Sequence, residues 1–258
     1  MAKFISVTSS KGGVGKSTST VEIAARLHDK GYRVLVIDLD ENCSLSKNIG
    51  ADVTSIDATS HSALTGAKSV AECVQHHDLF DILVGSKKYA DAELEFKGDD
   101  DKYRLADLKE IVDDDYDFIF ADNAPSRSIL LKMIYIASDY VIIPTFCDVS
   151  SMDMIHETEL DIETLKNNRN HDSHAEVIGY ILSNYRASTT MNNIAFSDLQ
   201  EMAAKYDNPP FVEKVHEAIS ASAAKTFQTS ISRSDKKSSL INIDYDSITD
   251  RVLERVGK

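Results

Sequence analysis

Residues 9–19, SSKGGVGKSTS, have the composition of a loop that wraps around phosphate groups. Glycines let the backbone N–H groups turn inward toward phosphate oxygens, where a Cβ atom would clash. A strand-like run precedes the loop and a helix-like pattern follows it. The partial positive charge at a helix N-terminus favours bound anions, so this context supports a phosphate site. The backbone of the loop is supplied by Gly12, Gly13, Val14 and Gly15.

The loop contains two lysines, although a phosphate site of this type needs one. Lys16 stands directly before the hydroxyl pair Ser17 and Thr18, and we expect it to reach the β- and γ-phosphates of a nucleoside triphosphate. We expect Ser17 to offer its hydroxyl to Mg²⁺ and Thr18 to contact the α-phosphate. Lys11, which precedes the first glycine, has no place in this scheme and raises the question of what a second cation does there.

Acidic residues follow two apolar runs that are typical of buried strands. VLVIDLD contains Asp38 and Asp40, and DFIFAD ends in Asp122, the pattern of a Walker B aspartate. Ligands of open α/β sheets bind at the carboxyl ends of the strands, and Mg²⁺ prefers oxygen ligands. The three carboxylates are therefore predicted to converge on the phosphate loop.

Short apolar runs alternate with helix-length amphipathic segments along the chain. The near-continuous hydrophobicity of these runs indicates strands that are buried on both faces, as in a parallel sheet. The sequence predicts an α/β fold, a doubly wound, mostly parallel sheet with helices on both faces. Strands are expected at 3–8, 33–38, 80–85, 117–122, 140–145 and 177–183, and helices at 16–31, 150–168, 192–206 and 244–256.

Length and composition favour one large globular domain over residues 1–258. The net charge of −14 argues against a protein that coats nucleic acid over its whole surface. No apolar run is long enough to span a membrane, and the three cysteines are far apart, so we expect a soluble, cytoplasmic protein with reduced thiols. Many of the acids lie in 91–117, and 96–104 is expected to be a solvated loop.

Three further segments have competing interpretations. The tail helix lacks a basic face with bulky aromatics, so packing against the domain is favoured over membrane binding; Tyr245, Ile248, Val252 and Val256 would form its buried face. His76, His77 and the HDSH segment at 171–174 fit solvated loops better than metal ligands. Residues 232–239, SRSDKKSS, are either an ordinary loop or a contact to DNA phosphates.

Taken in order, KGGVGKST, VLVIDLDEN, FIFADNAPS and VIIPTFCD resemble the deviant Walker A P-loop ATPases of the ParA/MinD superfamily. The resemblance is greatest to the ParA/Soj chromosome and plasmid partition ATPases, and it extends from about residue 3 to about residue 200. It implies ATP and Mg²⁺ as cofactors. It also implies an ATP-dependent homodimer in which Lys11 reaches across to the phosphates of the partner copy, as an arginine finger does.

The resemblance assigns further roles. Asp40 would orient the attacking water, Asp38 and Asp122 would hold the metal and its waters, and the turn at 123–128 would respond to the γ-phosphate. Asn184 matches a position from which relatives contact adenine, although a turn residue at the end of a strand explains it equally well.

The chain departs from the family pattern at three places. Asp40 is followed by Glu41-Asn42-Cys43 where the family usually has Pro-Gln-Gly, and Ala124 replaces the first proline of the Walker B turn. After residue 205 the family's V-I-P-R-N pattern is missing, and KVHEAISASAAK at 214–225 stands roughly in its place. These departures leave every predicted catalytic group in place.

The expected function is that of an ATP-dependent DNA segregation ATPase. It would hydrolyse ATP, bind DNA nonspecifically when dimeric, associate with the nucleoid, and respond to a ParB-type partner. A MinD-like ATPase that positions a membrane or protein cargo is the alternative; the acidic tail counts against membrane attachment.

Overall fold

The computed structural model describes residues 1–124, 126–147 and 151–257. Within them, the strands form one sheet in the order β3-β4-β2-β5-β1-β6-β7-β8. Neighbouring strands are parallel except for β3 and β4, which are antiparallel. The strands are β1 Lys3–Val7, β2 Val34–Leu39, β3 Val74–His76, β4 Asp81–Leu83, β5 Phe118–Asn123, β6 Tyr140–Thr145, β7 Glu176–Tyr185 and β8 Phe211–His216.

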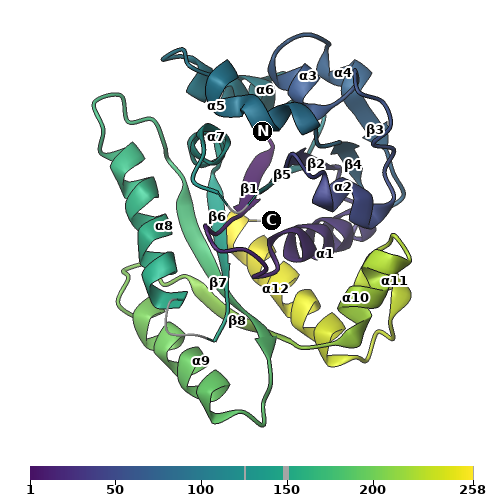
Figure 1. Ribbon diagram of the computed structural model, residues 1–258. Helices are drawn as coiled ribbons and strands as arrows, with labels where there is room; N and C mark the ends of the chain where they lie inside the picture. Colours follow the sequence, from purple (N-terminus) through teal and green to yellow (C-terminus); the bar gives the residue numbers. More distant parts are fainter. Residues whose placement is uncertain (125, 148–150, 258) are drawn as a thin grey trace.

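Helices cover both faces of the sheet, as the sequence predicts (Figure 1). One face packs against α1 Lys16–Asp29, α2 Ser44–Ile49, α10 Ile219–Thr226, α11 Ile231–Ser234 and α12 Leu240–Val256. The other packs against α3 Ser60–Leu64, α4 Val70–Cys73, α5 Ala92–Glu95, α6 Arg104–Val112, α7 Ile129–Ala137, α8 Ser151–Lys166 and α9 Thr190–Ala203. Two 3₁₀ turns, η1 Lys87–Asp91 and η2 Asp101–Tyr103, flank α5.

Side chains of the central strands alternate between the two apolar layers. In β5, Phe118 and Phe120 pack with the α1 and α12 layer, whereas Ile119 and Ala121 pack with the α6 and α7 layer. All four are fully buried. A central parallel strand needs apolar side chains on both faces, which explains the continuous apolar runs in the sequence.

The six predicted strands are all present, and their ends differ from the prediction by at most two residues. Two edge strands were missed, for physical reasons. β3 has only three residues, and β8 (FVEKVH) carries charged side chains and is only partly buried. Edge strands face solvent on one side, so they lack the continuous hydrophobicity that marks a central strand.

The four predicted helices are present, with ends that differ from the prediction by at most four residues. The helix expected at 192–206 ends at Ala203, before the two prolines, and the tail helix begins at Leu240 instead of residue 244. The predicted buried face of the tail helix is confirmed, because Tyr245, Ile248, Val252 and Val256 are each at most 5% exposed.

The acidic segment at 96–104 is only partly a solvated loop. Asp99 and Asp100 are exposed as expected, but Phe96 is buried beneath α6 and Arg104 begins that helix. No helix in the described part of the chain is long and apolar enough to cross a membrane.

Candidate nucleotide-binding site

The phosphate-binding loop connects β1 to the first turn of α1, as predicted. Gly13 and Gly15 have φ angles of 77° and 91°, a region in which glycine is strongly favoured. Gly15 also lies against β7, because a Cβ atom there would stand 3.3 Å from the hydroxyl oxygen of Ser183. That hydroxyl donates a 2.8 Å hydrogen bond to the carbonyl of Val14. The end of β7 therefore holds the loop in position.

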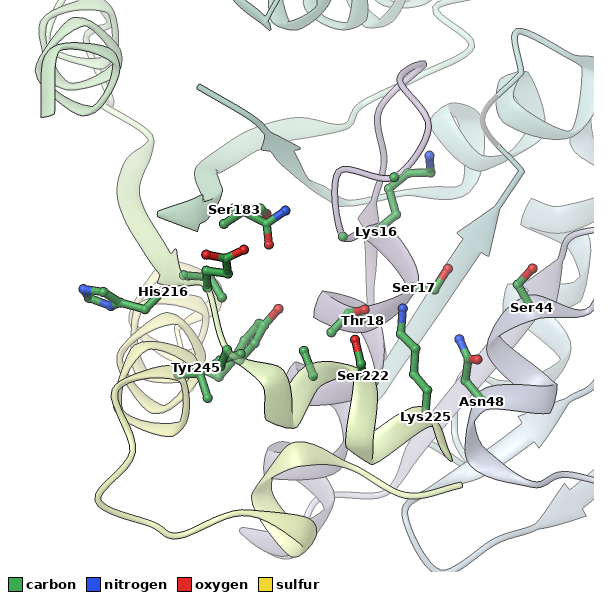
Figure 2. Close-up of a pocket in the computed structure, with 18 of the residues that line it drawn as sticks. Lys16, Ser17, Thr18, Ser44, Asn48, Ser183, His216, Ser222, Lys225 and Tyr245 are labelled. Atoms are coloured by element: carbon green, nitrogen blue, oxygen red, sulfur yellow. The ribbon is translucent and has the colours of Figure 1, made fainter. Parts of the chain in front are cut away.

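A cavity of about 610 Å³ opens beside the loop (Figure 2). This volume falls in the range of small-molecule sites, about 300–1,000 Å³. The structure brings together at this cavity the predicted site residues Gly13, Gly15, Lys16, Ser17, Thr18, Asp40 and Asn184. Among the described residues, Lys11, Gly12, Val14, Asp38 and Asp122 are not part of the lining.

The two lysines of the loop have different surroundings. Lys16 is 6% exposed, and its ammonium group donates a 2.9 Å hydrogen bond to the backbone carbonyl of Lys11. Burial lowers the pKa of Lys16 below its ordinary value, although the nearby carboxylates of Asp122 and Asp40 partly oppose this shift. The ammonium group of Lys11 lies 5.9 Å from the centre of the Phe146 ring. Lys16 therefore serves the cavity of its own chain, and Lys11 lies beside that cavity.

Asp38 and Asp122 are direct neighbours across β2 and β5, as the parallel register pairs their Cα atoms. Asp38 is fully buried and accepts hydrogen bonds from the backbone N–H of Asp40 at 3.0 Å and from the hydroxyl of Ser46 at 2.6 Å. The Ser46 N–H adds a third, at 3.0 Å. Burial raises the pKa of Asp38 to about 6 despite these bonds. Both carboxylate oxygens of Asp38 are thus engaged by its own chain, which fastens the start of α2 to β2.

Asp122 is 1% exposed, and neither of its carboxylate oxygens has a hydrogen-bond partner among the described residues. Burial, together with repulsion from Asp38, raises its pKa to about 8. The neighbouring Ser17 hydroxyl and Lys16 ammonium oppose that rise in pKa without reaching hydrogen-bond geometry. A buried carboxylate without a hydrogen-bond partner destabilises the folded protein unless a cation or an ordered water binds to it.

These residues fit a magnesium ion held largely by phosphate and water. Asp122 offers two unpaired oxygens next to the Ser17 hydroxyl, which matches the preference of Mg²⁺ for oxygen. No cluster of three or more His, Cys, Asp or Glu with metal-site geometry occurs in the part of the chain that the structure describes. The histidine pairs singled out in the sequence therefore form no such site there; His76, for example, pairs with Asp81 on an exposed surface.

The turn after β2 accommodates the departure from the family pattern with an unusual backbone. Cys43 takes the position where the family usually has glycine, and its φ of 52° is in the left-handed region that glycine favours. Asp40 lines the cavity and accepts a 3.0 Å hydrogen bond from the Asn42 N–H. Because Gly85 has no side chain, its backbone can lie close to Asp40; a Cβ atom there would stand 2.8 Å from the Asp40 carbonyl oxygen.

Asn184 lies at the end of a strand and also lines the cavity. It is exposed, lines the cavity, and has a φ of 54°. It also lies where the register between β7 and β8 shifts, between Leu182 and Tyr185. A β-bulge of this kind re-aims side chains, and here it places Asn184 at the cavity.

The far wall of the cavity was not predicted from the sequence. It comes from α2, from the end of β8 and from the segment after it, and so includes much of the stretch at 214–225 that replaces the family pattern. Because β8 is a charged edge strand, its apolar signal was too weak to place the segment after it. The missed residues are Ser44, Asn48, Asn123, Ser183, Val215, His216, Glu217, Ala218, Ala221, Ser222, Lys225, Ile241 and Tyr245.

The turn that follows Asp122 connects the site to two helices. Asn123 accepts a 3.2 Å hydrogen bond from the Thr8 hydroxyl, next to the phosphate loop. Arg127 pairs with Asp161 on α8, and Ser128 caps the N-terminus of α7. The predicted turn at 123–128 also contains Pro125, which lies outside the described residues.

Comparisons with known proteins agree with this geometry. A family model described as an AAA domain matches residues 2–174. The chromosome partitioning protein ParA of Myxococcus xanthus is 26% identical over 241 residues, which cover 92% of this chain and 83% of ParA. The sporulation initiation inhibitor protein Soj of Bacillus subtilis is 27% identical over 222 residues, covering 85% and 84%. The chain belongs to the ParA/MinD superfamily of P-loop ATPases.

Solved structures of other proteins have the same fold as this chain. Cobyrinic acid a,c-diamide synthase from Mycobacterium smegmatis with bound ATP analogue and magnesium has a TM-score of 0.84 and 23% identity, covering 100% of this chain and 97% of the synthase. A plasmid partition protein from Borrelia burgdorferi bound to AMPPNP has a TM-score of 0.82 and 20% identity, covering 99% and 100%. A Cyanothece McdA(D38A)-ATP complex has a TM-score of 0.83 and 16% identity, covering 99% and 96%.

Proposed function

We propose that this chain is a partition ATPase of a single domain that dimerises on ATP, binds DNA nonspecifically and releases it after hydrolysis stimulated by a ParB-type partner. The observation that carries the proposal is the cavity between Lys16 and Asp40, with Asp122 buried and unpartnered beside the Ser17 hydroxyl. This arrangement of phosphate loop, metal-binding carboxylate and water-orienting carboxylate is what nucleoside triphosphate hydrolysis needs.

Hydrolysis would convert ATP and water to ADP and phosphate at this cavity. Lys16 would bind the β- and γ-phosphates, Thr18 the α-phosphate, and Asp40 would orient the water that attacks the γ-phosphorus. Magnesium, when bound, neutralises charge that develops on the phosphates. Ser17 and Asp122 would hold the ion and its waters, and Asp38 would keep Asp122 and the start of α2 in register through its bonds to Ser46.

We propose that Lys11 acts on the partner copy. Its backbone carbonyl orients Lys16, and its ammonium group lies beside Phe146 rather than in the cavity lining of its own chain. A second copy facing the loop would bring this charge to the phosphates, where it would stabilise the transition state. Without nucleotide, two positively charged loops would repel each other, so pairing would depend on ATP.

Nonspecific DNA binding would require a local cationic surface, because the chain as a whole carries −14. In the segment at 232–239, Arg233 is paired with Asp29, while Lys236 and Lys237 are exposed. A few cations bind weakly, but pairing doubles them, and bivalent attachment makes binding depend on the dimer. We expect a cytoplasmic protein that associates with the nucleoid when bound to ATP.

The proposal is tested by DNA-binding titrations with ATP, with ADP and with a Lys16→Ala variant, each across a salt series with magnesium. We expect nonspecific duplex DNA to be bound only by wild-type protein with ATP, and less tightly as salt rises. A non-hydrolysable triphosphate should also convert the protein to a dimer in sedimentation experiments. A protein that stays monomeric and leaves DNA unbound at low salt would refute the proposed function.

The MinD-like alternative finds less support. The apolar face of α12 is packed against the sheet and α1, so it is not available to a membrane. Sedimentation with anionic liposomes and ATP distinguishes the two functions, since only the alternative predicts that the protein pellets with lipid.

A further inference from the structure

A lysine outside every predicted motif lines the nucleotide cavity on the side opposite the phosphate loop. Lys225 belongs to α10, and Figure 2 shows its side chain extending from that helix toward the Thr18 end of α1, with Asn48 of α2 beside it. Its segment replaces the family pattern, so no motif pointed to it. The cavity thus has a cation on each side: Lys16 on the loop and Lys225 on α10.

The position of α10 is fixed by packing on both sides of Lys225. The preceding residue, Ala224, is 3% exposed and belongs to the core that contains α1 and α12. After the helix, Gln228 packs so closely against Gly50, at the end of α2, that a Cβ atom on Gly50 would stand 3.0 Å from its Cβ. The Ile231 N–H then donates a 2.7 Å hydrogen bond to the buried carboxylate of Glu22. Lys225 is therefore carried by a helix that is held against α1 and α2.

The ammonium group of Lys225 has no charged partner among the residues that the structure describes. No hydrogen bond or ion pair involves its ammonium group in the part of the chain that the structure describes, and the side chain is exposed. The lining residues drawn near it in Figure 2, Thr18, Asn48 and Ser222, are uncharged. A cation that faces the N-terminus of α1 across a ligand-sized cavity creates a site for an anion between them.

We propose that Lys225 binds the α-phosphate of the nucleotide, so that α10 and the first turn of α1 both contact this phosphate. The inference rests on the proposed function only in taking an adenine nucleotide as the ligand. Thr18, the residue expected to contact the α-phosphate, lines the same cavity, and Figure 2 shows the Lys225 side chain extending toward the turn of α1 that carries Ser17 and Thr18. Because ADP and ATP share that phosphate, Lys225 contributes equally to both and does not distinguish substrate from product.

Calorimetric titrations of ADP, ATP and adenosine test this assignment in wild-type protein and in Lys225→Gln and Lys225→Arg variants. Loss of one charge-assisted hydrogen bond should weaken ADP and ATP binding by the same factor, roughly 5- to 20-fold. Lys225→Arg should retain most of the affinity, and adenosine should bind all variants equally. Lys205→Gln is the matched control, because Lys205 is an exposed lysine outside the cavity lining, and it should bind ADP as wild type does.

Two outcomes overturn the proposal: unchanged ADP affinity in Lys225→Gln, or an equal loss of adenosine affinity, which would assign the side chain to the sugar or base. An unchanged melting temperature of the nucleotide-free variant excludes a folding defect as the cause of a loss. The titration contains no DNA and no partner. If Lys225→Gln weakens ADP binding but the wild type never binds DNA, the partition function is refuted and this inference stands. If the wild type binds DNA but Lys225→Gln binds ADP normally, this inference is refuted and the partition function stands.

Discussion

The two walls of the nucleotide cavity are built in different ways. The phosphate wall, formed by the loop after β1 and the turns after β2 and β5, consists of buried polar groups that constrain one another, such as Asp38 with Ser46. The far wall, formed by α2, the ends of β7 and β8, the segment up to Lys225 and the start of α12, is more exposed and holds its shape through helix packing. Buried charges and close backbone contacts leave few acceptable side chains, whereas packing only requires suitable volumes. The family pattern is retained in the loop after β1 and changed at a few positions in the turns after β2 and β5, whereas it is lost over the whole stretch at 214–225.

The largest expected effect comes from Asp40→Asn on the phosphate wall. Loss of the carboxylate that we propose to orient water should lower kcat for ATP hydrolysis by about 10²-fold, while ADP affinity stays near wild type. Steady-state hydrolysis and ADP titration measure the two quantities separately. Glu41→Gln removes the same charge from the exposed neighbouring residue and should hydrolyse ATP normally. Equal rates for Asp40→Asn and Glu41→Gln would remove Asp40 from the mechanism.

The next effect tests the close backbone contacts of the phosphate wall. Gly85→Ala places a Cβ atom 2.8 Å from the Asp40 carbonyl oxygen and 3.0 Å from the Cys43 Cα atom. Because both neighbours are backbone, the free energy of unfolding should fall by roughly 2 kcal/mol, as measured by urea denaturation. Gly98→Ala is the comparison, since the Cβ atom there meets only the movable Asp101 side chain. A smaller decrease in the free energy of unfolding for Gly85→Ala than for Gly98→Ala would show that the backbone contacts of the phosphate wall are not rigid.

The buried carboxylates predict an unusual pH dependence. The native pKa of Asp122 is raised to about 8, so the native state keeps a proton that the unfolded chain loses near its ordinary value of 3.8. This group therefore makes the nucleotide-free protein less stable as pH rises from about 4 to 8. Asp122→Asn removes that contribution and should stabilise the free protein by roughly 5 kcal/mol at pH 8, with the gain vanishing toward pH 4.

Thermal unfolding at several pH values measures this change in stability. The same variant should lose much of the stabilisation that MgATP gives the wild type, because Asp122 would hold the metal. Asp100→Asn, on the exposed acidic segment, should leave the pH profile unchanged. An Asp122→Asn protein whose stability tracks wild type at every pH would show that this carboxylate is not held protonated by burial.

The smallest effect concerns the contact that joins the two walls. The hydroxyls of Ser19 on α1 and Tyr245 on α12 lie 3.1 Å apart and are buried. A double-mutant cycle with Ser19→Ala and Tyr245→Phe should give a coupling energy of about 1 kcal/mol in the free energy of unfolding. Additive effects would mean that the walls are stabilised independently.

Much of the phosphate wall could be predicted because its signals are local. The glycines of the loop, the hydroxyls after Lys16 and the acids that end β2 and β5 each lie within a few residues of a strand end. Parallel strands present their carboxyl ends at one edge, so topology alone brings Asp38 and Asp122 together. Apart from Asn184, the far wall gave no such signal, because Lys225 and Asn48 lie far apart in sequence and neither belongs to a motif.

The sequence by itself determined the layered α/β fold, the phosphate loop and the superfamily, because hydrophobic periodicity and residue spacing are properties of the chain. Only the tertiary structure decided that the oxygens of Asp38 accept hydrogen bonds from Asp40 and Ser46, that those of Asp122 have no such partner among the described residues, and that Lys225 lines the cavity. Burial and hydrogen-bond partners depend on which distant segments pack together. Identical carboxylates on adjacent strands therefore acquire different surroundings and pKa values once the helices close over the sheet.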